Sequence, residues 1–175
     1  MSVEKPLVNR VASSGIITFN LELYFPKEAI ASFDLKDYLF MELILKEKDF
    51  REALKAHDWT QYEGKNLCVF CSADAIIPTW AYMLVAIYAT PFAKAIVQAD
   101  EDEFYKMHYH QIIQSLDTEQ FRDKRVVIKG CSGKPVPVSA YVDLTRALRL
   151  VAKTIMYGEP CSTVPLYKKP RPSRK

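Results

Sequence analysis

One pattern of residues occurs twice in the chain, in residues 58–94 and again in residues 117–153. The two copies stand 59 positions apart over most of their length, and the offset becomes 60 only at a Cys-Ser pair. Self-similarity at a fixed offset is the sequence signature of a repeated structural unit. The sequence therefore predicts an internal duplication. The matched pairs are Asp58/Asp117, Gln61/Gln120, Lys65/Lys124, Cys71/Cys131, Pro78/Pro137, Ala81/Ala140, Tyr82/Tyr141 and Lys94/Lys153.

Each copy, with the residues before it, is expected to fold as helix, strand, helix, strand. In the first copy Asp49 opens an amphipathic helix, residues 67–71 form an apolar strand, and Pro78 begins a second helix. The second copy repeats this order. Crossovers of this kind favour parallel strands, so the predicted class is α/β, with two α-β-α-β units (about 46–97 and 105–157) forming a mostly parallel sheet with helices packed on it.

The N-terminal part is rich in β-branched and aromatic residues. Residues 16–24 and 29–35 each read as a strand, and together they predict an N-terminal β-hairpin extension. Residues 1–167 are long enough for a single domain with a substantial core. Residues 168–175 combine Pro with five Lys or Arg, a composition typical of a disordered basic tail.

Charge and composition exclude several classes of protein. The net charge is +3, but without the tail it is −2, so nucleic-acid binding is not indicated. No apolar run approaches the roughly 18 to 20 residues of a membrane span, and the first residues lack the form of a secretory signal. Four cysteines in 175 residues do not make a disulfide framework. We therefore expect a cytoplasmic protein with free thiols and no membrane association.

Three cysteines follow predicted strands. Cys71 and Cys131 occupy matching places before a helix, and Cys161 follows the last strand of the second unit. The carboxyl ends of parallel strands are where ligands bind in such sheets. If the two units pack about a twofold axis, these sulfurs approach one another, and Asp74 can add an oxygen ligand. Further loop candidates are Ser72, Lys129, Ser132 and Ser162.

Three thiolates and a carboxylate suit zinc or an iron–sulfur cluster. The spacing matches no known ligand signature, and small buried cysteines filling tight strand-to-helix turns are the alternative. Cys68 lies three residues before Cys71 on the same strand, so the two side chains point to opposite faces and Cys68 is expected in the core. A thiol-dependent enzyme with Cys71 or Cys131 as nucleophile is a second hypothesis, although no His lies in either loop to serve as a base.

Longer blocks of the sequence resemble a bacterial family, the one catalogued as domain of unknown function 2480. The resemblance covers about residues 7–168 and implies a small cytosolic protein with no established activity. Members of that family are often encoded beside genes of the sulfur-mobilisation pathway of iron–sulfur cluster assembly, and Cys71, Cys131 and Cys161 lie within the shared blocks. These blocks include His57-Asp58-Trp59, Cys71-Ser72-Ala73-Asp74, Pro78-Thr79-Trp80-Ala81-Tyr82 and Gly158-Glu159-Pro160-Cys161-Ser162.

Three functions remain open from the sequence. The leading hypothesis is a metal- or iron–sulfur-binding accessory factor whose partners are iron–sulfur assembly proteins. The second is the thiol-dependent enzyme. The third is a structural or adaptor protein with buried cysteines, for which a homodimer is the simplest assembly.

Overall fold

The structure is a computed structural model and describes residues 15–130, 133–159 and 162–170. Contacts divide the chain into two compact units. The middle unit is Pro26–Met107, and the terminal unit contains both ends of the chain, up to Phe25 and from His108 onward. Each unit is described by itself, and the single domain expected over residues 1–167 stays a prediction. Within the described residues, none of the helices has the length and apolar character needed to cross a membrane.

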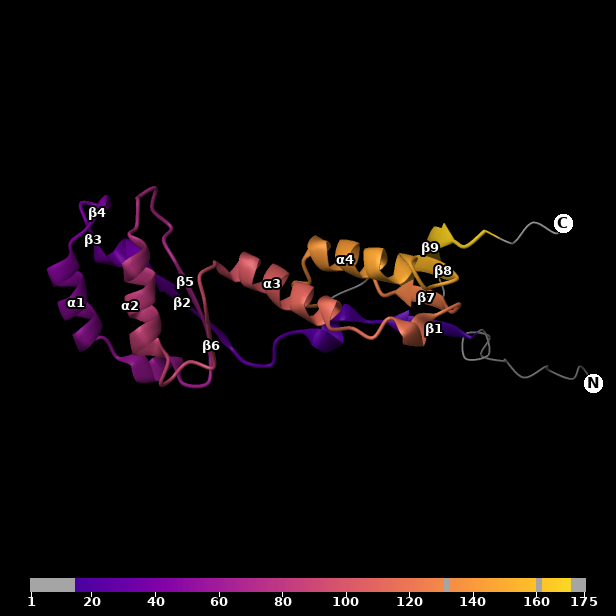
Figure 1. The fold of residues 1–175 in the computed structure, drawn as a ribbon, viewed down its shortest axis with the longest axis horizontal. Helices are drawn as coiled ribbons and strands as arrows, with labels where there is room; N and C mark the ends of the chain where they lie inside the picture. The colour runs from indigo at the N-terminus through magenta and orange to yellow at the C-terminus, as the bar shows by residue number, and fades with distance from the viewer. Residues whose placement is uncertain (1–14, 131–132, 160–161, 171–175) are drawn as a thin grey trace, which may run out of the picture. The chain divides into compact units, whose positions relative to one another are not determined.

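The middle unit is built on a three-stranded parallel sheet (Figure 1). Its strand order is β2-β5-β6, with β2 at Ile30–Asp34, β5 at Asn66–Phe70 and β6 at Ala95–Val97. Leu67, Cys68 and Val69 of β5 are at most 2% exposed, as expected for a central strand covered on both faces. The remaining elements are 3-10 helices η2 (Leu35–Tyr38) and η3 (Trp59–Tyr62), short strands β3 (Leu39–Phe40) and β4 (Ile44–Leu45), and helices α1 (Glu47–Ala56) and α2 (Thr79–Ala89).

Helix α2 follows from its sequence. Pro78 precedes its first residue with a backbone φ of −63°, which suits the entry to a helix. Ala81, Val85 and Ala89 recur every four residues and are fully buried, so they form the face that packs on the sheet. Met83 and Ile87, on another face, are exposed. Nearly all of α2 is apolar, but only one of its faces is fully buried, and the others are partly buried or exposed.

One half-buried histidine of the middle unit, His57, packs among aromatic rings at the border of the core. The hydroxyl oxygens of Tyr38 and Tyr62 lie 3.3 Å and 3.0 Å from the Nδ1 and Nε2 atoms of His57. The Gln61 amide nitrogen is 3.1 Å from Nε2 and donates to the Asp58 carbonyl oxygen at 2.7 Å, so its NH₂ group faces the ring. Burial lowers the pKa of His57, and a neutral Nε2 that accepts from Gln61 agrees with that direction.

Acidification should therefore weaken the fold through His57. Because its pKa is lowered in the folded state, the unfolded chain binds the proton first as the pH falls below about 6.5. Through His57, the free energy of unfolding should not change with pH above about 6.5. It should decrease as the pH is lowered from 6.5 towards the lower pKa that His57 has in the folded protein. Urea titrations from pH 7.5 to pH 5 test this. A His57→Gln variant retains His108 and His110, so it should show a flatter pH dependence, and an equal slope in both proteins would contradict the assignment.

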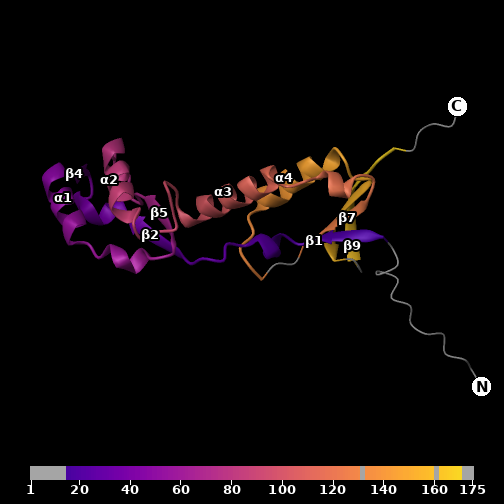
Figure 2. The same ribbon diagram turned by 60° about the horizontal axis from the view of Figure 1, so that its bottom comes forward.

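The terminal unit is built on a four-stranded mixed sheet of order β1-β7-β8-β9 (Figure 1). Strands β1, β7 and β8 run parallel, and β9 is antiparallel to β8. Helix α4 packs on one face of this sheet, as Figure 2 shows from a second direction. The strands are β1 (Ile16–Phe19), β7 (Arg125–Ile128), β8 (Thr154–Glu159) and β9 (Ser162–Lys168), and the helices are η1 (Leu21–Tyr24), α3 (Glu101–Gln114, which begins in the middle unit), η4 (Glu119–Phe121) and α4 (Val138–Arg149).

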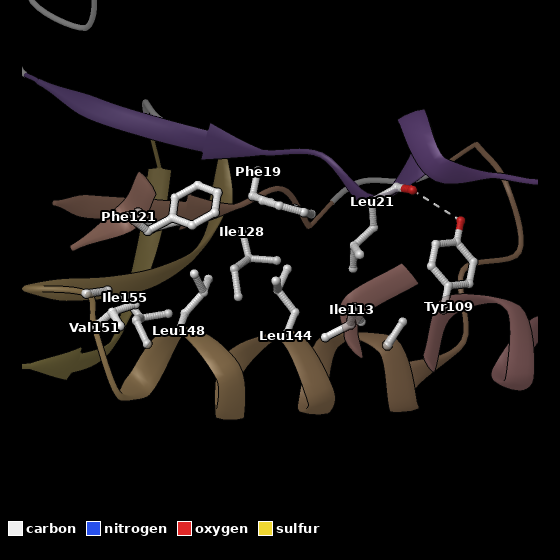
Figure 3. Packing of buried hydrophobic residues seen from close by; sticks show 13 residues of the cluster. Phe19, Leu21, Tyr109, Ile113, Phe121, Ile128, Leu144, Leu148, Val151 and Ile155 are labelled. Atoms are coloured by element: carbon white, nitrogen blue, oxygen red, sulfur yellow. Dashed lines mark hydrogen bonds between the residues drawn. The ribbon is translucent and has the colours of Figure 1, made fainter. Parts of the chain in front are cut away.

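The core of the terminal unit lies between α4, the second half of α3 and the sheet (Figure 3). Leu144 and Leu148 of α4 are fully buried and face Ile128 and Ile155 of the strands. Tyr109 of α3 is also fully buried, and its hydroxyl donates to the Leu21 carbonyl oxygen at 3.2 Å. A single apolar cluster therefore joins the N-terminal segment to elements more than 80 residues away.

Several backbone interactions of the middle unit recur in the terminal unit 59 positions further on. The Gln side chains after both Asp residues donate to the Asp carbonyl oxygen at the same distance, 2.7 Å. Gly64 and Asp123 both have φ near +60° and donate to a residue after the following helix. The paired interactions are Gln61–Asp58 and Gln120–Asp117, Gly64–Phe92 and Asp123–Val151, and Lys94–Lys65 and Lys153–Lys124.

The fold confirms the mixed α/β class with four α-helices in the described residues and a parallel sheet, and it corrects finer expectations. The prediction of an N-terminal hairpin is wrong, because β1 pairs with β7 and β2 pairs with β5, each in parallel. The terminal sheet is mixed, since β9 adds an antiparallel strand. Lys168, placed in the tail by sequence, is the last residue of β9, and Lys169 donates its backbone N–H to the Lys153 carbonyl oxygen at 2.8 Å. Residues 171–175 of the tail lie outside the described residues.

Candidate functional site

The candidate site of the middle unit lies at the carboxyl ends of β2 and β5. Asp34 is the last residue of β2 and is aligned with Phe70, the last residue of β5. The backbone N–H of Ser72 donates to Asp34 Oδ1 at 3.0 Å, and the Ser72 hydroxyl donates to Oδ2 at 2.5 Å. The backbone N–H of Lys36 adds a third donor at 2.9 Å. These contacts hold a carboxylate at the edge where parallel strands present ligand sites.

The ionisation of Asp34 follows from these contacts. Partial burial acts to raise the pKa of Asp34, but hydrogen bonds from the Ser72 side chain and from two backbone amides outweigh it. The net result is a pKa below the usual range of an aspartate. Asp34 is therefore anionic at neutral pH.

Cys71 lies between β5 and α2 and immediately precedes Ser72, the residue that donates to Asp34. It is a free, half-buried thiol whose Sγ is 3.6 Å from the Ala73 carbonyl oxygen. Tyr82 of α2 belongs to the same neighbourhood, because the pKa of its phenol is raised by burial and then by the nearby Cys71 and Asp34. A thiol, a carboxylate and a phenol thus share one neighbourhood at the end of the sheet. Sulfur and oxygen donors of this kind bind divalent metals such as zinc.

Cys68 has a different environment. It is fully buried in β5, as expected from its place on the strand. Burial, with smaller contributions from Glu101 and Asp100, raises the pKa of its thiol to about 11. A protonated, enclosed thiol is neither a good ligand nor a good nucleophile. The assignment of Cys68 to the core is confirmed.

The other predicted site residues have mixed outcomes. Asp74 is exposed in the loop after Cys71, and Ser162 is exposed as the first residue of β9. Lys129 lies just after β7, with its Nζ 3.8 Å from Glu22 Oε2. Cys131, Ser132 and Cys161 lie outside the described residues. Within the part of the chain that the structure describes, no group of three or more His, Cys, Asp or Glu side chains is arranged to hold a metal ion.

The described residues that flank positions 131 and 132 lie near the carboxyl end of the terminal sheet. Ile128 of β7 is aligned with Tyr157 of the neighbouring parallel strand β8. The Tyr157 hydroxyl donates to the Gly130 carbonyl oxygen at 3.2 Å, and Gly133 donates its N–H to Glu22 Oε1 at 2.5 Å. Gly130 and Gly133 thus both lie near the carboxyl end of this sheet.

Sequence reasoning did not single out Asp34 or Tyr82 as site residues. Asp34 lies one residue before the end of the second predicted strand (29–35), and a polar residue near the carboxyl end of a strand is the signal that could have identified it. Tyr82 was recognised only as part of the repeat, and its contact with the site depends on how α2 packs on β5.

These features define a small mixed α/β protein with a thiol and a carboxylate at the end of a parallel sheet. The chain belongs to the family described as "protein of unknown function (DUF2480)", whose model matches residues 5–169. No curated protein and no solved structure matches the chain.

Proposed function

We propose that this protein is a metal- or iron–sulfur-binding accessory factor of iron–sulfur cluster metabolism, acting in the cytoplasm with iron–sulfur assembly proteins as partners. The observation that carries the proposal is the half-buried thiol of Cys71 beside the anionic Asp34 at the carboxyl end of a parallel sheet. Cys71, Cys131, Cys161 and Asp74 are the proposed ligands, and the cofactor is zinc or an iron–sulfur cluster.

The neighbours of Cys71 favour this function over an enzyme with a cysteine nucleophile. A nucleophilic cysteine is activated by a base or by positive charge. The groups beside Cys71 are a carboxylate and a phenol, and both fit the surroundings of a bound cation better. A thiol-dependent enzyme that uses Cys71 or Cys131 stays the alternative hypothesis.

Metal content is the direct test. Protein made anaerobically with iron and zinc supplied should contain metal, and Cys71→Ser should lose at least half of it, because a thiolate ligand is removed. Cys131→Ser and Cys161→Ser are expected to act in the same direction. Cys68→Ala is the matched control, since it removes a buried thiol from the same strand.

Elemental analysis, with absorption spectra recorded under anaerobic conditions, gives the readout. Circular dichroism spectra should show that each variant is folded. Metal-free wild-type protein, or equal loss of metal in Cys68→Ala and Cys71→Ser, would contradict the proposal.

An adaptor function is favoured by a different observation. Met83 and Ile87 of α2 are 62% and 68% exposed on a helix that carries no charged residue. Exposed apolar side chains on a helix are typical of surfaces that bind another protein. Homodimerisation through α2 stays a hypothesis beside the metal-binding function.

We also infer that the two units derive from one duplicated ancestor. The hydrogen bonds that recur at an offset of 59 support this, as do the buried positions Ala81/Ala140 and Val85/Leu144. The similarity extends to the N-terminal strands, because Asn20 after β1 and Asp34 at the end of β2 each accept from the amide two residues on. On this view each unit contains one of those strands, a strand–helix–strand crossover and a 3-10 helix.

A further inference from the structure

The terminal unit contains a groove that the proposed metal site does not use. The groove has a volume of about 490 Å³ and lies between α4 and the strands β8 and β9. Its floor includes the buried side chain of Ile155, and its walls include Tyr141, Arg146, Arg149, Tyr157 and Tyr167. This volume is within the range of roughly 300 to 1,000 Å³ found for small-molecule sites, which are mostly apolar with a few polar groups.

A β-bulge shapes one wall of this groove. The register of β8 and β9 passes from Ile155 opposite Tyr167 to Met156 opposite Pro165, so Leu166 has no partner residue. An extra residue of this kind re-aims the side chains around it, and such bulges are common next to functional sites. Both Leu166 and Tyr167 line the groove as a result. An ordinary antiparallel register would send successive side chains to opposite faces of the sheet.

Two arginines of α4, Arg146 and Arg149, carry positive charge at the rim of the groove. The Arg149 guanidinium lies 3.8 Å from the centre of the Tyr167 ring, which holds it over the β9 wall. Arg146 is one helical turn earlier on α4 and 70% exposed, and its contact with Asp143 is long, at 3.8 Å. Two guanidinium groups three residues apart on one helix can approach the same anion.

The middle unit does not repeat this arrangement. The positions that match Arg146 and Arg149 at the offset of 59 are Ile87 and Thr90, and Tyr157 corresponds to Gln98. Strand β6 is also the last strand of its sheet, whereas β8 is followed by β9. The cationic, aromatic groove therefore belongs to the terminal unit alone among the described residues.

The ligand of the groove is not expected to be a peptide that adds to the sheet as a further strand, because the outer strand β9 is unsuited to such pairing. Pro165 lies in β9, where it removes a backbone N–H donor, and proline on an edge strand opposes strand addition. A compact ligand that enters between α4 and β9 does not depend on that edge. The positive charge of Arg146 and Arg149 and the apolar floor of the groove then favour a ligand with an anionic head group and an apolar body.

We propose that this groove binds an amphipathic anion, with an acyl or aromatic body on the floor at Ile155 and against the wall at Tyr157, and a carboxylate or phosphate head group at Arg146 and Arg149. The head group gains charge-assisted hydrogen bonds from the guanidinium groups, and the body gains from leaving water. This binding function is separate from the proposed metal site and requires none of the cysteines.

The test uses two dyes that differ in one charge. 8-Anilinonaphthalene-1-sulfonate is an aromatic anion, and N-phenyl-1-naphthylamine is the same aromatic body without the sulfonate. We expect saturable binding of the anion to full-length protein with a stoichiometry near one. An Arg146→Gln/Arg149→Gln double variant should bind it about three- to tenfold more weakly, the range for charged contacts at partly exposed positions, with little change for the neutral dye.

A second pair of variants, at Val142, tests the effect of charge while leaving in place Arg149, which stacks on Tyr167. Val142 lines the groove on α4 and is 60% exposed, so Glu and Gln should both be accommodated there. Val142→Glu should weaken binding of the anion relative to Val142→Gln, because the two side chains differ in charge and little in size. Arg122→Gln is a further control, since that exposed side chain pairs with Glu119 and does not line the groove.

Competition identifies the source of the anion. Laurate or dodecyl phosphate should displace the bound dye, whereas acetate and inorganic phosphate, which lack the apolar body, should not. Displacement by inorganic phosphate alone would replace the amphipathic ligand with a simple anion site and overturn the proposal. Wild-type protein without saturable binding, or equal affinities of the Val142→Glu and Val142→Gln proteins for the anionic dye, would also overturn it.

Discussion

Replacing Tyr109 by Ala is expected to lower the free energy of unfolding of the terminal unit by about 3 to 5 kcal/mol, the range found for truncation of large aromatic core residues. The Tyr109 side chain is fully buried in the cluster shown in Figure 3. Its ring packs with residues of the N-terminal segment and of α4, and its hydroxyl satisfies the Leu21 carbonyl oxygen. The truncation would therefore create a cavity and leave a buried acceptor without this donor.

Two further substitutions separate the ring from the hydroxyl. Tyr109→Phe keeps the volume and should cost only about 0.5 to 1.5 kcal/mol, the usual net value of one hydrogen bond. Lys106→Ala, on an exposed position of the same helix, should change stability by no more than about 0.5 kcal/mol.

Urea unfolding followed by far-UV circular dichroism measures these changes in both units. Both tryptophans, Trp59 and Trp80, lie in the middle unit, so their fluorescence reports that unit separately. A loss below about 1 kcal/mol for Tyr109→Ala would show that the ring is not part of a packed core.

Gly158→Ala should be strongly destabilising although it adds only one methyl group. Gly158 lies in β8 with a backbone φ of +121°, a region that side chains other than glycine rarely adopt. A Cβ at this position would stand 2.6 Å from the Ser162 carbonyl oxygen, which is backbone and cannot rotate away. Backbone strain and steric overlap together should cost about 2 to 5 kcal/mol of unfolding free energy.

The repeat supplies a matched control for this substitution. Gly64 has a φ of +68° with no atom within 4 Å of its would-be Cβ, and its counterpart is Asp123 at +56°. Gly64→Asp should therefore cost no more than about 1 kcal/mol, since Asp is among the residues that tolerate this conformation. Thermal melting of both variants measures the contrast, and similar melting temperatures for the two would contradict the steric argument.

Local sequence signals predicted individual elements well. Pro78 indicated the start of α2, and residues 67–71 indicated the buried strand that became β5. In each case the deciding interactions are within about one turn or one strand, so the sequence pattern contains them.

Strand pairing was predicted less well, because it depends on contacts between distant residues. Ile16–Phe19 and Ile30–Asp34 were recognised as strands, but their closeness in sequence suggested a hairpin that the structure does not contain. Strand β9 was missed, since Pro165 and the basic residues beside it resemble a loop and a tail. A proline is compatible with an edge strand, and only the position of β8 reveals that edge.

The candidate site shows the same division between local and distant information. Cys71 follows a central strand, as predicted, and Cys68 was assigned correctly to the core. Asp34 comes from another part of the chain, and only the parallel pairing of β2 with β5 brings it to Ser72. The three-cysteine site stays a prediction, because Cys131 and Cys161 lie outside the described residues.

The pairing of β1 with β7 has a consequence for biosynthesis. Ile16 pairs with Arg125, which the ribosome adds 109 residues later. At roughly 5 to 20 residues per second, β1 exists for about 5 to 20 s before its partner strand has been made. The middle unit is continuous in sequence, so it can close during this interval. The nascent chain must therefore keep the apolar strand Ile16–Phe19 from pairing with other strands until Arg125–Ile128 has been made.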